Sequence, residues 1–235
     1  MAGMLWLELA KGWYRVGEVV KVGIFARGFA DLPAGAGERR FKLWAVNPSG
    51  VFRELQVAPG GGSEVAAVEF LPGEPGVYTV AAAITGDVNF SARAYFCVEI
   101  ERNVLPPPGD AGLTVGPVWH EGSYLDWPVC LELRFNGERL SKVPASIFPG
   151  LWRGEKFSRF TDGAGQLFLD GRNWCYWQHG DEKKKGMVFA PWGVNWLVLA
   201  EHSDPTGRRH VATCTFCPAE AALRCGGAGE NQGLA

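Results

Sequence analysis

Closely spaced turn signals between short apolar strands limit most strongly what this chain can fold into. An apolar run ends at Phe135 and is followed by Asn136-Gly137, a dipeptide that readily takes the two positive φ angles of a type I′ hairpin turn. Thr161-Asp162-Gly163 forms a second turn from residues that tolerate left-handed backbone, and a strand follows it at 167–169. The two signals predict an immunoglobulin-like β-sandwich rather than a catalytic unit.

Strand patterns cover most of the chain, whereas helix patterns are nearly missing. The 32 glycines and 15 prolines fall mostly between the apolar runs, as turn residues do. Tyr78 follows Pro75-Gly76 at the start of a run, which is typical of the tyrosine corner of immunoglobulin-like sandwiches. The predicted strands are 18–25, 41–46, 51–57, 65–70, 77–81, 93–100, 129–135, 143–148, 157–161, 167–169, 174–179, 196–201 and 210–216.

The proline-rich segment 103–110 is the natural boundary between two domains, because its three consecutive prolines stiffen the chain and cannot join a central strand. A length of 235 residues accommodates two sandwiches of about 100 residues each. We therefore predict an all-β protein with two tandem immunoglobulin-like β-sandwich domains, an N-terminal one at 1–103 and a C-terminal one at 104–218. A short C-terminal tail covers 219–235.

Charge and hydropathy exclude several classes of function. The net charge of −2 argues against a nucleic-acid partner, which requires a basic face, and Lys183-Lys184-Lys185 is interpreted as a solvated loop tip. No apolar run approaches the roughly 20 residues of a membrane span, and the start of the chain lacks the pattern of a signal peptide. The chain as it stands is therefore expected in the cytoplasm, unless a leader precedes it.

Several short motifs occur in an order that resembles a known bacterial family. This family has two β-sandwich domains and no known function, and it is often labelled a nickel-uptake substrate-specific region. The resemblance spans roughly residues 5 to 216. It rests on Leu5-Trp6, Tyr14-x-Val16-Gly17-Glu18-x-Val20, Phe70, Pro75-Gly76-Val77-Tyr78, Leu131-x-Leu133-x-Phe135-Asn136-Gly137, Thr161-Asp162-x-x-Gly165, Trp196-Leu197 and Val211-Ala212-Thr213-Cys214-Thr215-Phe216.

The resemblance implies the family's fold, an association with nickel or cobalt uptake, and a periplasmic or extracellular location if a leader precedes this sequence. Family members place a metal-binding histidine immediately before the Leu-Trp pair. Met4 occupies that position here, and its thioether is a poor ligand for nickel or zinc. This departure weakens the expectation of metal binding.

The other metal candidates are His120, His202, Cys214 and Cys217, and the ion they would hold is a divalent one such as nickel or zinc. Cys214-x-x-Cys217 has the spacing of half a zinc site, but a three-residue separation along one strand directs the two side chains to opposite faces. His210 shares a face with Cys214 but lies about 13 Å away along the strand. Buried thiols and surface histidines are the simpler interpretation, so we expect no cofactor.

Tryptophans suggest a different binding surface. Trp152 and Trp192 lie in predicted loops, where exposed indoles can stack on sugar rings or anchor a protein partner, whereas Trp174 and Trp196 are expected to fill the core. Catalytic motifs such as Gly-x-Ser-x-Gly or His-Glu-x-x-His are missing. The sequence thus predicts a non-enzymatic protein that binds an unidentified protein or small ligand. The alternatives are a carbohydrate-binding protein and a structural adaptor.

Overall fold

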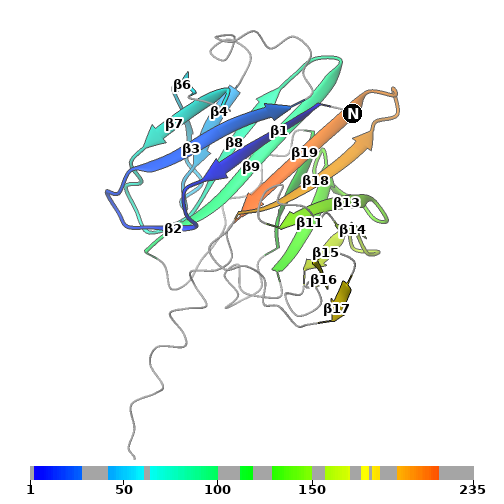
Figure 1. The fold of residues 1–235 in the computed structure, drawn as a ribbon. Coiled ribbons are helices and arrows are strands. Elements are labelled where there is room, and N and C mark those ends of the chain that lie inside the picture. Colours follow the sequence, from blue (N-terminus) through cyan, green and yellow to red (C-terminus); the bar gives the residue numbers. More distant parts are fainter. Residues whose placement is uncertain are drawn as a thin grey trace, which may run out of the picture.

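The computed structural model describes residues 3–27, 42–60, 64–99, 112–118, 129–149, 157–169, 176–179, 182–185 and 195–216. Within these ranges the regular structure is entirely β, as the strand and turn patterns predict (Figure 1). The strands form one nine-stranded sheet, two four-stranded sheets and one separate hairpin.

The nine-stranded sheet contains, in spatial order, β14 (Phe157–Phe160), β13 (Pro144–Pro149), β18 (Trp196–Ser203), β19 (Arg209–Phe216), β9 (Val88–Val98), β8 (Gly76–Ile84), β4 (Lys42–Val46) and β5 (Phe52–Glu54), and β2 (Trp13–Tyr14) also pairs with β9. One small sheet contains β1 (Met4–Leu9), β3 (Val20–Arg27), β7 (Ala66–Phe70) and β6 (Ala58–Pro59). The other contains β10 (Leu113–Pro117), β11 (Val129–Phe135), β12 (Glu138–Arg139) and β15 (Gln166–Leu169). The hairpin consists of β16 (Tyr176–His179) and β17 (Glu182–Lys185).

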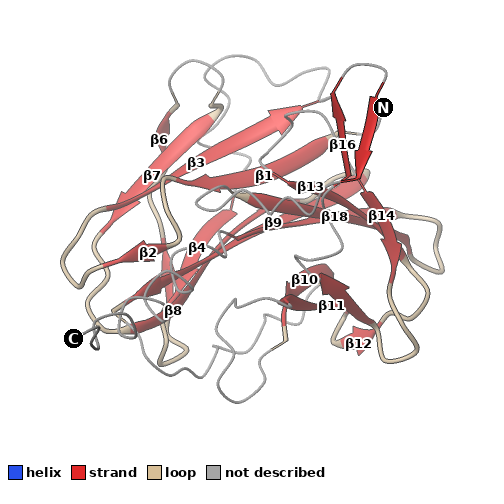
Figure 2. Ribbon diagram, turned by 60° about the horizontal axis from the view of Figure 1, so that its bottom comes forward, coloured by secondary structure: helices blue, strands red, loops and turns tan. Residues whose placement is uncertain are grey.

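The two small sheets cover opposite faces of the large sheet (Figure 2). Side chains alternate between the faces of a strand, and β9 shows this directly. Ala94 and Phe96 belong to the core beneath the β1–β3–β7 sheet, whereas Tyr95 between them belongs to the core beneath the β10–β11–β15 sheet. The result is two sandwiches that use the same central sheet.

The central sheet joins the two halves of the chain through β9 and β19, which pair in parallel from Arg209 opposite Val88 to Phe216 opposite Tyr95. Each core also receives one buried residue from the other half. Val211 of β19 lies in the N-terminal core, and Tyr95 of β9 lies in the C-terminal core. The boundary at residues 103–110 and the tail at 219–235 lie outside the described residues, so the division into independent domains stays a prediction.

The turn chemistry read from the sequence is confirmed. Asn136 and Gly137 have φ angles of 49° and 83°, and they connect β11 to β12 with Phe135 paired to Glu138. The Tyr78 hydroxyl donates a hydrogen bond to the backbone carbonyl of Glu74 at 3.0 Å, which is the contact expected of a tyrosine corner. The Asp162 carboxylate accepts backbone N–H bonds from two residues of its own turn.

The structure also departs from the sequence-based expectations. Lys183, Lys184 and Lys185 do not form a loop tip, because they lie in β17 and pair with β16. Strands β1 and β10 were not anticipated, although each contributes buried side chains to a core.

Candidate functional site

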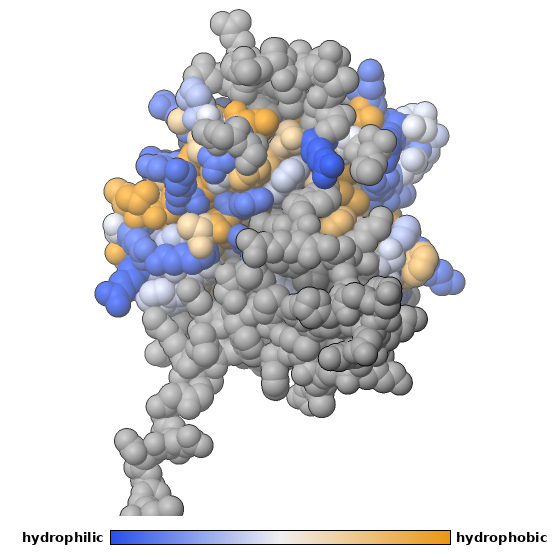
Figure 3. Space-filling model, in the orientation of Figure 1, coloured by the Kyte–Doolittle hydropathy of each residue, from blue (hydrophilic) through white to orange (hydrophobic). Residues whose placement is uncertain are grey.

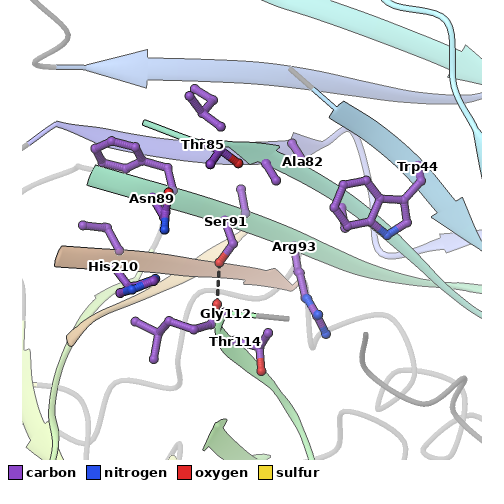
Figure 4. Close-up of a pocket in the computed structure, with 16 residues that line it drawn as sticks. Trp44, Ala82, Thr85, Asn89, Ser91, Arg93, Gly112, Thr114 and His210 are labelled. Carbon is purple, nitrogen blue, oxygen red and sulfur yellow. Dashed lines mark hydrogen bonds between the residues drawn. The ribbon is translucent and has the colours of Figure 1, made fainter. Parts of the chain in front are cut away.

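A groove of about 310 Å³ lies on the face of the central sheet that β10 borders, at the junction between the two halves (Figure 4). Its position follows from the layers, because the β10–β11–β15 sheet packs over β13, β18 and β19, and β10 marks the edge of that layer toward β8 and β4. The described lining residues are Trp44, Ala81, Ala82, Ala83, Ile84, Thr85, Asn89, Phe90, Ser91, Ala92, Arg93, Gly112, Leu113, Thr114, His210 and Val211.

Strand register arranges the side chains on this face of the sheet in two rows across three strands, and all of them except Lys42 line the groove. Trp44 pairs with Ala81, and Ala81 pairs with Arg93, so these three residues form one row. Lys42 pairs with Ala83, and Ala83 pairs with Ser91, which gives the second row. In both rows the middle position is alanine, whose small side chain leaves room between the larger residues of β4 and β9.

The groove becomes more accessible along β8. Ala81 and Arg93 are buried, whereas Ala83 and Ser91 are half-buried and Lys42 is exposed. The Ser91 hydroxyl donates a hydrogen bond to the Leu113 carbonyl at 2.6 Å, which fixes β10 against β9 at the border of the groove (Figure 4). Among the described residues, the groove is therefore most open at the end formed by Ala83 and Thr85.

Arg93 lies at the buried end of the groove, where it pairs with Cys214 across β9 and β19 and interacts with Tyr95. Burial raises the pKa of Tyr95 to about 12, although the nearby Arg93 charge acts in the opposite direction. Burial also raises the pKa of the Cys214 thiol well above its usual range, again against the effect of Arg93. Both groups are therefore protonated and neutral near pH 7, which makes Cys214 a poor nucleophile and a poor metal ligand.

The predicted metal ligands are not brought together where the structure describes them. Cys214 pairs with Val198 across the β18–β19 ladder, four positions along β18 from His202. At a rise of about 3.3 Å per residue, Cys214 and His202 are separated by about 13 Å along the strand direction. Within the described part of the chain no three His, Cys, Asp or Glu side chains form a group able to hold a metal ion. His120 and Cys217 lie outside the described residues.

Two histidines of the C-terminal sandwich contact the same aromatic ring. His202 and His210 pair across β18 and β19, and the centroid of each imidazole lies 4.8 Å from that of Phe135. The Nε2 atom of His210 lies 3.2 Å from Oδ2 of Asp204. Hydrogen bonds from Thr206 and His210 to Asp204 hold the pKa of this carboxyl well below its usual range. Asp204 and His210 form a carboxylate–imidazole pair like that in a catalytic triad, but the hydroxyl of the groove serine, Ser91, donates to Leu113.

Among the described tryptophans, Trp196 lies in a core and Trp44 lines the groove. Trp196 is 1% exposed and fills the C-terminal core, as predicted. Trp152, Trp192 and Trp174 lie outside the described residues, so the expected aromatic surface stays a prediction. Sequence reasoning missed Trp44 as a groove residue. Two sequence signals could have revealed it. Lys42 and Trp44 alternate with apolar residues, and Ala81-Ala82-Ala83 is a run of small side chains that leaves space on the surface of a strand.

A small apolar area lies at the opposite end of the N-terminal sandwich, where β3 begins and β7 ends (Figure 3). Val16, Val19 and Leu71 are between 40% and 56% exposed there, and the Gly17 N–H donates to the Pro72 carbonyl between the two loops. Isolated exposed apolar residues are common on protein surfaces. The groove therefore remains the stronger candidate for a binding site.

Searches against models of known families and against curated proteins find no match for the chain. Solved structures give distant similarities. The D0-D1 domain of intimin has a TM-score of 0.31 and 12% identity over 92% of this chain and 100% of its own length. A tetra-tandem repeat from the extending region of a large adhesion protein has a TM-score of 0.30 and 12% identity over 92% of this chain and 49% of its own length.

Escherichia coli alpha-2-macroglobulin activated by porcine elastase has a TM-score of 0.31 and 19% identity over 93% of this chain and 20% of its own length. The chain thus spans about half of the adhesion-protein repeat and one fifth of the macroglobulin. Similarities at this level assign neither a family nor a function. The structure itself contains no helix, within the described residues, that is long and apolar enough to cross a membrane.

Proposed function

We propose that this protein is a non-enzymatic binding module whose ligand site is the groove between β4, β8, β9 and β10. The observation that carries the proposal is the pair of rows in which alanine lies between a large side chain of β4 and a polar or charged side chain of β9. Such an arrangement combines a concave apolar floor with a few polar groups at its borders. This combination is characteristic of small-ligand sites, and the volume of about 310 Å³ lies at the lower end of their range.

An association with nickel or cobalt uptake, and with it a periplasmic or extracellular location, rests on the family resemblance alone. The separation of His202 from Cys214 and the neutral, buried thiol of Cys214 do not favour a metal as the ligand. A small organic molecule fits the groove better, because the described lining is mostly apolar and contains hydroxyl and amide groups at its borders.

A thermal-shift screen of small metabolites, sugars and divalent metal ions tests the proposal. Compounds that raise the midpoint of the wild-type protein are then measured on Ala83→Trp, in which an indole fills the groove floor, and on Ala164→Trp, which changes an exposed turn residue elsewhere. We expect genuine ligands to lose their effect with Ala83→Trp and to keep it with Ala164→Trp. Ligands that stabilise both folded variants equally would show that the groove is not the binding site.

A further inference from the structure

We propose that the groove binds a carbohydrate that carries a carboxylate group, with Trp44 contacting the apolar face of a sugar ring and Lys42 attracting the carboxylate. This inference rests on the proposed function and names its ligand class. It is independent of the loop tryptophans Trp152 and Trp192. The three groups that support it are the aromatic side chain, the neutral hydrogen-bonding groups and the charged groups that surround the alanine floor.

Trp44 supplies the aromatic surface. It belongs to β4, its neighbours Leu43 and Ala45 face the N-terminal core, and Trp44 therefore faces the groove. Trp44 is half-buried, so part of the indole remains available beside Ala81 and Ala83. A sugar ring has an apolar C–H face and a polar rim, and an indole beside a shallow floor is suited to the apolar face.

Neutral polar groups lie where the rim of such a ring would be. Thr85, Asn89 and Ser91 line the accessible end of the groove. The Oδ1 atom of Asn89 accepts the Gly86 N–H at 3.3 Å, which orients the amide and leaves its NH₂ group as a donor on the groove side. Thr85 can donate and accept hydrogen bonds, Asn89 can donate through its NH₂ group, and Ser91, whose proton is given to Leu113, can accept. This set of groups matches the hydroxyl groups of a carbohydrate.

The charge of the groove favours an anionic ligand. Arg93 and His210 line the groove, Lys42 is exposed at the end of the row that contains Ala83, and the described lining contains neither Asp nor Glu. Asp204 partly offsets His210. Two other acidic residues are near in the strand order, Glu54 opposite Trp44 on β5 and Asp87 in the β8–β9 turn, and neither lines the groove. Complementary charge contributes to both association rate and specificity.

A peptide strand fits the groove less well than a sugar. Peptides that add to a sheet require a strand edge with unpaired backbone groups. The floor of the groove is β8, and β8 is paired on both sides, with β4 and with β9. The floor therefore offers no backbone hydrogen bonds to a ligand, and at the border strand β10 the Leu113 carbonyl already accepts the Ser91 hydroxyl, so recognition falls to side chains. This favours a ligand with its own ring faces and hydroxyl groups.

Calorimetric titration of the full-length protein with trigalacturonate and with the neutral trisaccharide maltotriose tests the inference. We expect trigalacturonate to bind and maltotriose to bind at least about tenfold more weakly. Raising the ionic strength to about 0.5 M should weaken trigalacturonate binding, because Lys42 is exposed and its attraction is screened. Lys42→Glu should reduce the affinity about tenfold or more, whereas the control Lys21→Glu, on an exposed lysine of β3, should leave it unchanged.

Trp44→Leu should weaken binding about tenfold through loss of the aromatic contact, and Phe52→Leu, on the exposed aromatic residue of β5, should not. Unchanged thermal midpoints identify variants that remain folded. Equal affinity for the acidic and neutral trisaccharides would overturn the charged-ligand inference. Binding of neither sugar, together with binding of another compound that Ala83→Trp abolishes, would overturn the carbohydrate and leave the groove as the binding site.

Discussion

The hydroxyl of Thr213 in β19 donates a hydrogen bond to the backbone carbonyl of Leu5 in β1 at 2.8 Å, across 208 positions of sequence. Thr213 is 1% exposed and Leu5 is equally buried, so water does not compete for this bond. The contact ties the first described strand of the chain to the last one. It also places β19, which comes from the C-terminal half, against the sheet of the N-terminal half.

Replacement of Thr213 by valine should destabilise the protein. The substitution keeps the shape of the side chain but removes the donor to Leu5, and we expect a loss of about 1–2 kcal/mol in the free energy of unfolding. Ser203→Ala, which removes an exposed hydroxyl at the end of β18, is the matched control and should have little effect. Urea denaturation measures both. Equal midpoints for Thr213→Val and the wild type would show that the bond contributes nothing to stability.

Substitution at Gly137 tests the hairpin between β11 and β12. Its φ angle of 83° strains a β-branched residue, so Gly137→Val should cost about 1–3 kcal/mol in the free energy of unfolding. Gly163 lies in another turn without a positive φ angle and has open space at its Cβ position. Gly163→Val is therefore the control. A similar small loss for both variants in chemical denaturation would contradict the role of backbone strain at Gly137.

The close approach of Gly116 to Tyr95 gives a third prediction. A Cβ atom at Gly116 would lie 2.6 Å from the Tyr95 hydroxyl oxygen. Because Tyr95 is buried in the C-terminal core, its ring has little freedom to move, and Gly116→Ala should cost about 1–3 kcal/mol. The cost should be smaller in a Tyr95→Phe background, which removes the clashing oxygen. A double-mutant cycle by thermal denaturation measures this coupling, and additive effects would rule out the contact as the cause.

Residues 104–218 are predicted to fold alone, with a lower midpoint than the full chain. The fragment keeps the core residues of β10, β11, β13, β18 and β19 but loses Tyr95, and it exposes the edge of β19 that pairs with β9. A purified fragment should show one cooperative thermal transition. A fragment without such a transition would mean that the shared sheet is essential and that the halves are not independent domains.

Local chemistry was predictable from the sequence, whereas contacts between distant strands were not. The turn at Asn136-Gly137 and the tyrosine corner at Tyr78 depend only on residues close by in the chain, so a local sequence pattern is enough to predict them. The parallel pairing of β9 with β19 joins strands more than 100 residues apart, and no local pattern specifies that register. The groove depends on this pairing and on cross-strand rows, which explains why Trp44 and Arg93 were not recognised as neighbours of one site.

A measurement of nickel binding distinguishes the metal-binding role that the family resemblance implies from the groove site proposed above. We expect the purified, tag-free protein to contain no stoichiometric transition metal and to bind nickel only weakly, as scattered histidines do. A strong site needs three or four convergent nitrogen or sulfur ligands, but His202 and Cys214 lie four positions apart on neighbouring strands, and burial keeps Cys214 protonated. Elemental analysis and calorimetric nickel titration measure this. One equivalent of tightly bound metal that disappears with His120→Ala, His202→Ala or Cys214→Ala would overturn the prediction and establish a metal-binding role.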